Sequence, residues 1–288
     1  MSLDNLSVLI DLLDDPDYEV YNAVSMQLLS KGVSIIPDLE LAWEKSSNEI
    51  VQSRIENILQ QIQTNQAYIG LKNWIKSGAE DVLLGAYWVA RNQYSDLLFS
   101  KIEREVEKFR NRIWVELNDS LTALEKVRII NHFLYDSYNF SNEQDFMKPS
   151  YCFINHVLDT RKGNPVTLAI IYMAVCWRLD LPVYCLCVPR NFLLVYNDVL
   201  LDQELFFINP FYKGLPLSRA DIEEYLKQMK IESRNEYFHP RSNKACILRL
   251  IETLVYIYEQ EGNTAKVDIY KRLIPLFKGE NTYFQEEE

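Results

Sequence analysis

The stretch PVTLAIIYMAVCW, from Pro165 to Trp177, is apolar on nearly every side when it is drawn as a helix. Proline is tolerated in the first turn of a helix, because no backbone N–H is needed there. A helix that lacks a polar face is buried on most sides. The sequence therefore predicts a central buried helix of about three and a half turns that begins at Pro165.

Short runs of β-branched, aromatic and leucine residues follow this stretch. They are VYCLCV at 183–188, FLLVY at 192–196, VLL at 199–201 and LFFI at 205–208. Runs of this length and composition predict strands. Asn197–Asp198, between the second and third runs, predicts a tight hairpin turn. A buried helix followed by an antiparallel sheet is an α+β arrangement.

The first 63 residues show the spacing of four short amphipathic helices. Leu6, Leu9 and Leu13 share one helical face, and similar stripes recur at 20–28, 36–43 and 55–62. Two helix pairs of about equal length resemble HEAT-type repeats, whose hairpins bury their stripes by stacking on neighbours. A plain helical cap would show the same periodicity, so both interpretations stay open.

Residues 68–117 also follow a helical pattern, and capping signals place further helices. Thr122 with Glu125 predicts a helix that runs to about residue 137, and Ser218 with Asp221 predicts another. Residues 244–258 and 265–277 form a helical hairpin around a turn at 262–263. We expect a mostly helical α+β protein with a helical module at 1–65, a core with a helical lead-in at 66–230, and a helical hairpin with a tail at 231–288.

The charge and composition of the chain exclude several classes of function. The net charge is −11, the wrong sign for holding a phosphate backbone, and no basic stripe is present, so no nucleic-acid partner is expected. No apolar run reaches the roughly 18 residues that span a bilayer, so no membrane is expected either. The acidic N-terminus lacks the basic region of a signal peptide, which predicts a cytoplasmic protein.

The cysteines and histidines offer little material for a metal site. Five cysteines, an odd number without a CxxC pair, indicate free thiols in a reducing compartment rather than a disulfide framework. The three histidines are scattered along the chain. We expect neither a metal nor another cofactor.

A central helix followed by a sheet is also the arrangement of papain-like cysteine enzymes. Those enzymes place a thiolate at the N-terminus of the buried helix, where the helix dipole lowers the thiol pKa. A histidine on the following strand accepts the proton, and an Asp or Asn on the next strand orients that histidine. In this chain the order helix, strand, strand puts Pro165, Asn191 and Asn209 at these places.

Three blocks of the sequence carry a more specific resemblance. They are INHVLDTRKGNPVTLAIIYMAVCWRLDLPV at 154–183, VPRNFLLVY at 188–196 and INPFYKGLPLS at 208–218. In this order they resemble the transglutaminase-like family related to the bacterial SirB proteins, whose pattern is roughly N-x-V-L-x-x-R-x-G-x-P-x-x-L, G-L-P, P-G-H-F-L-V and D-P-F-x-x-G-x-x-L. In that family a tetratricopeptide-like segment follows the core, as the C-terminal hairpin does here.

The resemblance implies a core whose three catalytic positions are degenerate. True transglutaminases have Cys where this chain has Pro165, and the SirB-related branch generally has Pro there. That branch usually keeps a His where this chain has Asn191, and an Asp where it has Asn209. Proline cannot attack a carbonyl and asparagine cannot accept a proton near neutral pH. The resemblance therefore implies a non-catalytic protein that binds a protein or peptide through its cleft and helical modules.

Two alternatives stay open beside this interpretation. Cys152 and His156 are four residues apart, so on one helix they would share a face and could form a displaced nucleophile pair of a hydrolase or acyltransferase. A structural subunit without a cleft ligand is the other. If the cleft binds a peptide, the candidate residues are Arg161 and Asn164, which precede the helix N-terminus where an anion is favoured. Asn191 and Asn209 are candidates as well, because their amides can hydrogen-bond to an extended peptide. If it does not, Arg161 lies in a solvated turn and both Asn side chains satisfy backbone groups.

Overall fold

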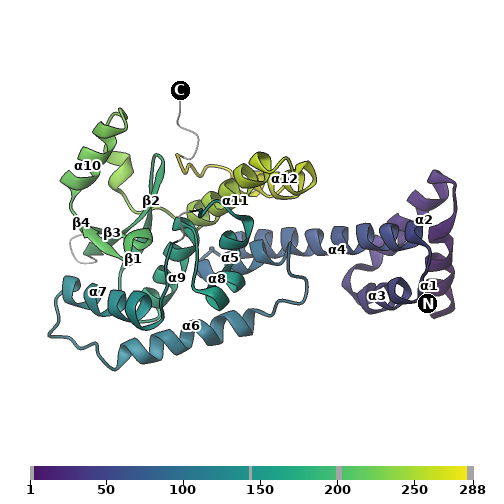
Figure 1. Ribbon diagram of the computed structural model, residues 1–288, viewed down its shortest axis with the longest axis horizontal. Helices are drawn as coiled ribbons and strands as arrows, with labels where there is room; N and C mark the ends of the chain where they lie inside the picture. The colour runs from purple at the N-terminus through teal and green to yellow at the C-terminus, as the bar shows by residue number, and fades with distance from the viewer. Residues whose placement is uncertain (1–2, 143–144, 199–202, 284–288) are drawn as a thin grey trace. The chain divides into compact units, whose positions relative to one another are not determined.

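The predicted central helix is confirmed. In the computed structural model, which describes residues 3–142, 145–198 and 203–283, α9 spans Pro165–Trp177 (Figure 1). Every residue from Val166 to Cys176 is buried. The helix packs against α5 (Val82–Ala90), α6 (Phe99–Trp114) and the sheet. The chain divides into two compact units, Met1–Gly70 and Leu71–Glu288, whereas the finer boundary near residue 230 stays a prediction.

The N-terminal unit contains the predicted helices, with one correction. Its helices are α1 (Leu3–Asp11), α2 (Tyr18–Lys31), α3 (Ile36–Lys45) and the first part of α4 (Glu49–Lys76). The fourth helix does not end near residue 63. It continues because its apolar stripe continues through Ala67, Leu71 and Trp74, which are all buried.

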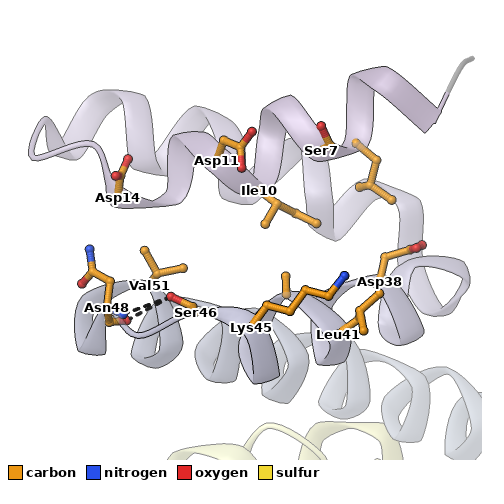
Figure 2. Close-up of a pocket in the computed structure, with 12 residues that line it drawn as sticks. Ser7, Ile10, Asp11, Asp14, Asp38, Leu41, Lys45, Ser46, Asn48 and Val51 are labelled. Carbon is orange, nitrogen blue, oxygen red and sulfur yellow. Dashed lines mark hydrogen bonds between the residues drawn. The ribbon is translucent and has the colours of Figure 1, made fainter.

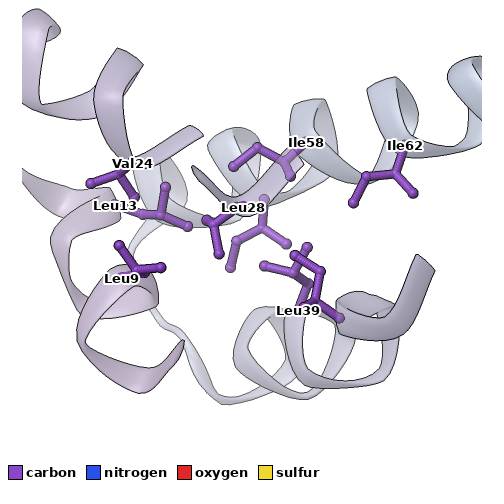
Figure 3. Packing of buried hydrophobic residues seen from close by; sticks show 9 residues of the cluster. Leu9, Leu13, Val24, Leu28, Leu39, Ile58 and Ile62 are labelled. Atoms are coloured by element: carbon purple, nitrogen blue, oxygen red, sulfur yellow. The ribbon is translucent and has the colours of Figure 1, made fainter. Parts of the chain in front are cut away.

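A single apolar cluster holds the N-terminal unit together. Leu13 of the 3-10 turn after α1, Leu28 of α2, Leu39 of α3 and Ile58 of α4 are fully buried in it (Figure 3). Burying one such side chain stabilises a fold by about 2 kcal/mol. The helical content of this unit is confirmed, and its likeness to HEAT repeats stays a prediction.

The sheet has four antiparallel strands in the order β1-β2-β3-β4. They are β1 (Val183–Val188), β2 (Asn191–Asp198), β3 (Gln203–Asn209) and β4 (Leu215–Leu217). The predicted hairpin turn at Asn197–Asp198 is wrong. Both residues belong to β2 and pair with β3 after a register shift, so pairing across the strands prevails over their turn propensity. The predicted strand at 199–201 lies outside the described residues.

The remaining helices surround α9 and the sheet. They are α7 (Ala123–Asn131), continued by a π-helical turn at His132–Ser137, α8 (Ile154–Thr160), α10 (Arg219–Gln228), α11 (Asn243–Gln260) and α12 (Thr264–Lys271). Both predicted capping boxes, before α7 and before α10, are present. The predicted C-terminal hairpin is α11–α12, and α11 packs against α5 and α9. A mostly helical α+β fold is thus confirmed.

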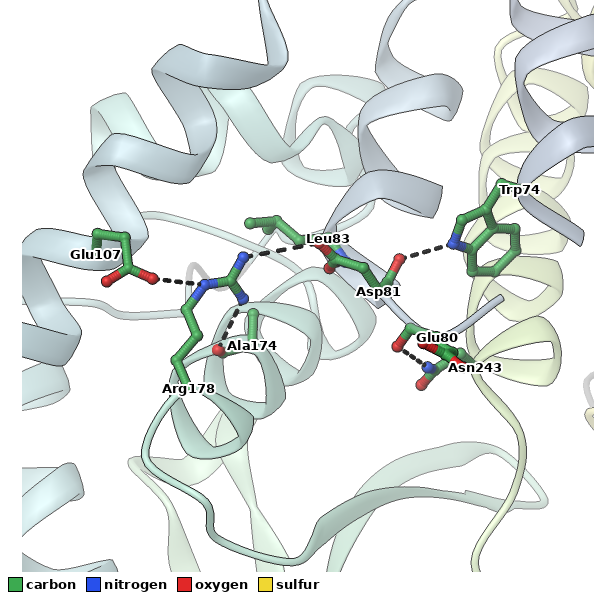
Figure 4. Close-up of polar contacts among 8 residues, drawn as sticks. All are labelled: Trp74, Glu80, Asp81, Leu83, Glu107, Ala174, Arg178 and Asn243. Atoms are coloured by element: carbon green, nitrogen blue, oxygen red, sulfur yellow. Dashed lines mark hydrogen bonds and ion pairs between the residues drawn. The ribbon is translucent and has the colours of Figure 1, made fainter. Parts of the chain in front are cut away.

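Polar contacts fix the far end of α9 to the loop before α5 (Figure 4). The Arg178 guanidinium lies 3.0 Å from a carboxylate oxygen of Glu107 and 3.7 Å from one of Asp81. Trp74 donates its indole N–H to the Asp81 carbonyl at 2.8 Å. Asn243 at the start of α11 donates to two carbonyls of the same loop, at 2.9 and 2.7 Å. The C-terminal end of α9 is therefore fixed by polar contacts, whereas its N-terminal end borders a cavity that is described below.

Candidate functional site

The N-terminus of α9 is held by Asn164, which caps the helix. Its side-chain oxygen accepts hydrogen bonds from the backbone N–H of Thr167 at 2.9 Å and from the Thr167 hydroxyl at 3.2 Å. Its amide nitrogen donates to the Cys152 sulfur at 2.8 Å. Asn164 is fully buried. These contacts set the start of the helix at Pro165, the position at which the family resemblance places the nucleophile.

A cavity of about 650 Å³ opens beside this helix start. It is lined from α9, from the β1–β2 turn, from α11 and from the segment before α8. The lining residues are Phe146, Met147, Asn164, Pro165, Val166, Arg190, Asn191, Phe192, Arg249, Thr253 and Tyr256. Of the candidate positions, Pro165, Asn164 and Asn191 are therefore brought together in one cavity.

Asn191 begins β2 directly after a two-residue turn. Val188 and Asn191 pair across the hairpin, and Arg190 between them has a left-handed φ of 57°. The Asn191 side-chain oxygen accepts a hydrogen bond from the backbone N–H of Phe192 at 2.8 Å. The family pattern has Gly where this chain has Arg190, so the turn here carries a cationic side chain into the cavity lining.

Asn209 lies outside the cavity lining. Its side-chain oxygen accepts hydrogen bonds from the backbone N–H groups of Phe211 and Tyr212 at 3.2 and 3.3 Å. Because Leu194 pairs with Ile208, Asn209 nevertheless lies at the same end of the sheet as Asn191. Asn209 thus serves as a cap for the turn at Pro210–Tyr212.

Arg161 also lies outside the cavity lining. A guanidinium nitrogen is 2.6 Å from a carboxylate oxygen of Glu105, and the group lies over the rings of Phe109 and Phe140. Although partial burial opposes it, hydrogen bonds from Lys108 and Arg161 hold the pKa of Glu105 below its ordinary value. Arg161 links α8 to α6 in this structure and does not form the solvated turn that the sequence suggested as the alternative to a cleft role.

Cys152 and His156 do not share a helix. Cys152 ends a 3-10 turn at Pro149–Cys152, whereas His156 belongs to α8. The Cys152 side chain is 1% exposed, and burial raises the pKa of its thiol well above the ordinary value. The His156 ring lies near Tyr151, with centroids 6.0 Å apart. The two side chains therefore lack the arrangement that the four-residue spacing predicted.

The cavity lining combines cationic and apolar groups. Sequence reasoning missed Arg249, Tyr256 and Phe146, because no local pattern marks them and because α11 begins 25 residues after the last motif block. Burial lowers the pKa of Arg249 from its ordinary value, yet guanidinium stays charged in proteins. The described lining holds no cysteine, histidine, aspartate or glutamate. The side chains that most often act as nucleophile and general base are therefore missing from the described lining.

The described residues contain neither a metal-binding cluster nor a helix that could span a membrane. No group of three or more His, Cys, Asp and Glu side chains there is arranged to hold a metal ion. Among the same residues, no helix has both the length and the apolar character needed to cross a bilayer.

Comparisons with known proteins show the family of the chain. The profile of the Transglutaminase-like superfamily matches residues 100–252, and the chain belongs to that superfamily. Similar proteins include a UPF0162 protein of Xylella fastidiosa (23% identical, covering 64% of this chain and 66% of the relative). They also include Protein SirB1 of Salmonella typhimurium (27%, covering 52% and 56%).

The similarity extends beyond bacteria but not over whole proteins. F-box only protein 21 of Mus musculus is 23% identical over 51% of this chain and 24% of its own length. The bacterial matches span 56% to 66% of those relatives. No solved structure matches the chain significantly. The SirB-related resemblance is thus confirmed, and the activity of any relative is not carried over.

Proposed function

We propose that this chain is a non-catalytic member of the superfamily that binds a protein or peptide partner in the cavity at the start of α9. The observation that carries the proposal is the lining of that cavity. Pro165 occupies the helix N-terminus and Asn191 the facing strand, and the described lining contains no cysteine, histidine, aspartate or glutamate. What remains is a binding site without catalytic chemistry.

The chemistry of the lining indicates what the partner presents. Arg190, Arg249 and the α9 N-terminus favour a carboxylate, while Phe146 and Met147 favour an apolar side chain. An extended peptide with an apolar residue beside an acidic residue, or beside its own C-terminal carboxylate, combines both. The flanking helices would extend the contact surface.

The alternative of a displaced cysteine nucleophile lacks comparable support. The buried thiol of Cys152 is protonated at neutral pH, and its sulfur already accepts a hydrogen bond from Asn164. A thiol is a weak nucleophile until it is deprotonated. A cytoplasmic location and the lack of a nucleic-acid partner stay predictions; the five free, buried cysteines support the former.

Activity assays test the first half of the proposal. Amine incorporation into casein and hydrolysis of a peptide library should both stay at background with the full chain. Activity that is lost in a Cys152→Ala variant would refute the proposal and support the displaced nucleophile.

A combined variant tests the geometry of the three positions. Pro165→Cys, Asn191→His and Asn209→Asp together should fold and show a thiol with a lowered pKa. An ordinary alkylation profile in that folded variant would show that the three positions do not form a triad.

A displayed random peptide library tests the binding half. We expect selected peptides to carry an apolar residue next to a carboxylate, and to lose about tenfold in affinity with Tyr256→Ala. Tyr256 is 42% exposed, so this change should not disturb the core. Tyr18→Ala is the matched control, because Tyr18 is also exposed and does not line the cavity. Failure to select any peptide would favour a structural subunit without a cleft ligand.

A further inference from the structure

A second cavity, of about 730 Å³, lies in the N-terminal unit and has no part in the site described above. All its lining residues come from the first 51 positions of the chain. Figure 2 shows Ile10 and Asp11 of α1 facing Leu41 and Lys45 of α3 across a groove. We call this cavity the α1–α3 groove.

The floor of the α1–α3 groove is apolar and firmly held. Leu6, Ile10, Ala42 and Val51 line the groove and also pack against the apolar core of the unit. Leu41 leaves 48% of its surface exposed. Because the floor residues are anchored in the core, the groove offers a preformed apolar surface.

The rim of the groove is acidic. Asp11, Asp14 and Asp38 line it, against one cation, Lys45. Within the described part of the chain, none of these three carboxylates takes part in a side-chain hydrogen bond or ion pair. The whole unit repeats this imbalance, since residues 1–70 hold 11 Asp and Glu but three Lys and Arg. Their net charge of −8 is most of the −11 of the full chain.

We propose that the α1–α3 groove docks a basic amphipathic helix of a partner protein. Apolar side chains of that helix fill the floor, and its lysines and arginines meet the three aspartates, as in other helix-in-groove complexes. The nine residues of α1 extend about 14 Å, which matches two to three turns of a partner helix. A second copy of this chain is disfavoured, because two units of such negative charge repel each other.

Fluorescence anisotropy with the full chain tests this proposal, which does not depend on the function of the core. The probe is a labelled 14-residue helix of leucine and lysine in amphipathic order. One matched peptide replaces every lysine with glutamate, and another replaces every leucine with glutamine. We expect the leucine–lysine peptide to bind and both matched peptides to bind at least about tenfold more weakly.

Variants distinguish the groove from general attraction to an acidic surface. Asp11→Asn with Asp38→Asn should raise the Kd about fivefold. Glu40→Gln with Glu44→Gln removes the same charge from exposed positions outside the groove, and should change the Kd less than about twofold. Equal weakening by the two pairs would overturn the proposal.

A second pair of variants tests the contribution of the apolar floor to peptide binding. Leu41→Ser should weaken peptide binding about tenfold, because it removes exposed apolar surface within the groove. Val33→Ser, at a position that is 45% exposed and outside the groove, should leave the affinity unchanged. Equal effects at both positions would refute a basic helix as the occupant. So would equally tight binding of the peptide whose lysines are replaced by glutamate, or no binding of the leucine–lysine peptide. Circular dichroism of every variant should match that of the unchanged chain.

Discussion

Replacing Asn164 with alanine should lower the free energy of unfolding by about 3 kcal/mol. Loss of a helix N-cap costs about 1 kcal/mol. The backbone N–H of Thr167, which is fully buried, would also lose its partner, and an unsatisfied buried donor costs about 2 kcal/mol more. The lost contact with the Cys152 sulfur adds a smaller amount.

Denaturant unfolding followed by tryptophan fluorescence measures this loss, because four of the five tryptophans belong to Leu71–Glu288. Asn263→Ala is the matched control. Asn263 caps α12 by accepting from the backbone N–H of Lys266 at 3.2 Å, but it is exposed, so water can replace the cap. We expect a loss of about 1 kcal/mol there. Equal losses in the two variants would refute the argument that burial at the start of α9 makes its cap critical.

Three further predictions follow from the same structure. Gly214→Ala should lower the free energy of unfolding by at least about 3 kcal/mol, measured by thermal unfolding, because Gly214 has a left-handed φ of 68° and a Cβ would overlap with Asn131. Gly262→Ala is the control, because Gly262 has a similar φ of 69° but no atom near its Cβ position, and it should lower the free energy of unfolding by about 1 kcal/mol. Glu105→Gln should make the free energy of unfolding less sensitive to acid. The lowered pKa of Glu105 contributes stability that is present above about pH 5 and is lost as the pH falls through the pKa of Glu105 in the folded protein. An unchanged slope of unfolding free energy against pH would contradict this. Iodoacetamide should modify the native cysteines roughly a hundredfold more slowly than those of the guanidinium-unfolded chain, by mass spectrometry, and rapid native labelling of Cys152 would contradict its burial.

Local sequence signals failed at three places in the chain. The Asn197–Asp198 pair has strong turn propensity, but backbone pairing with Glu204 and Gln203 keeps both residues in β2. The α4 helix passes its expected end because the buried residues Ala67, Leu71 and Trp74 continue its apolar stripe. The four-residue spacing of Cys152 and His156 predicted a shared helical face, but Phe153 separates a 3-10 turn from α8.

The sequence by itself determined the central helix, the first strand and both capping boxes. Each of these depends on side chains within a few positions of one another, and apolar periodicity or a capping pair records such contacts directly. It also gave the prediction, which stays a prediction, that Pro165, Asn191 and Asn209 occupy the catalytic positions of the superfamily.

Only the tertiary structure decided which residues share the cavity. Asn191 and Arg249 line it together although 58 positions separate them, while Arg161, four positions before Pro165, turns to Glu105 instead. The acidic rim of the α1–α3 groove likewise exists because packing on one core brings α1 and α3 together. Such neighbourhoods are set by the packing of whole elements, which leaves no short-range pattern in the chain.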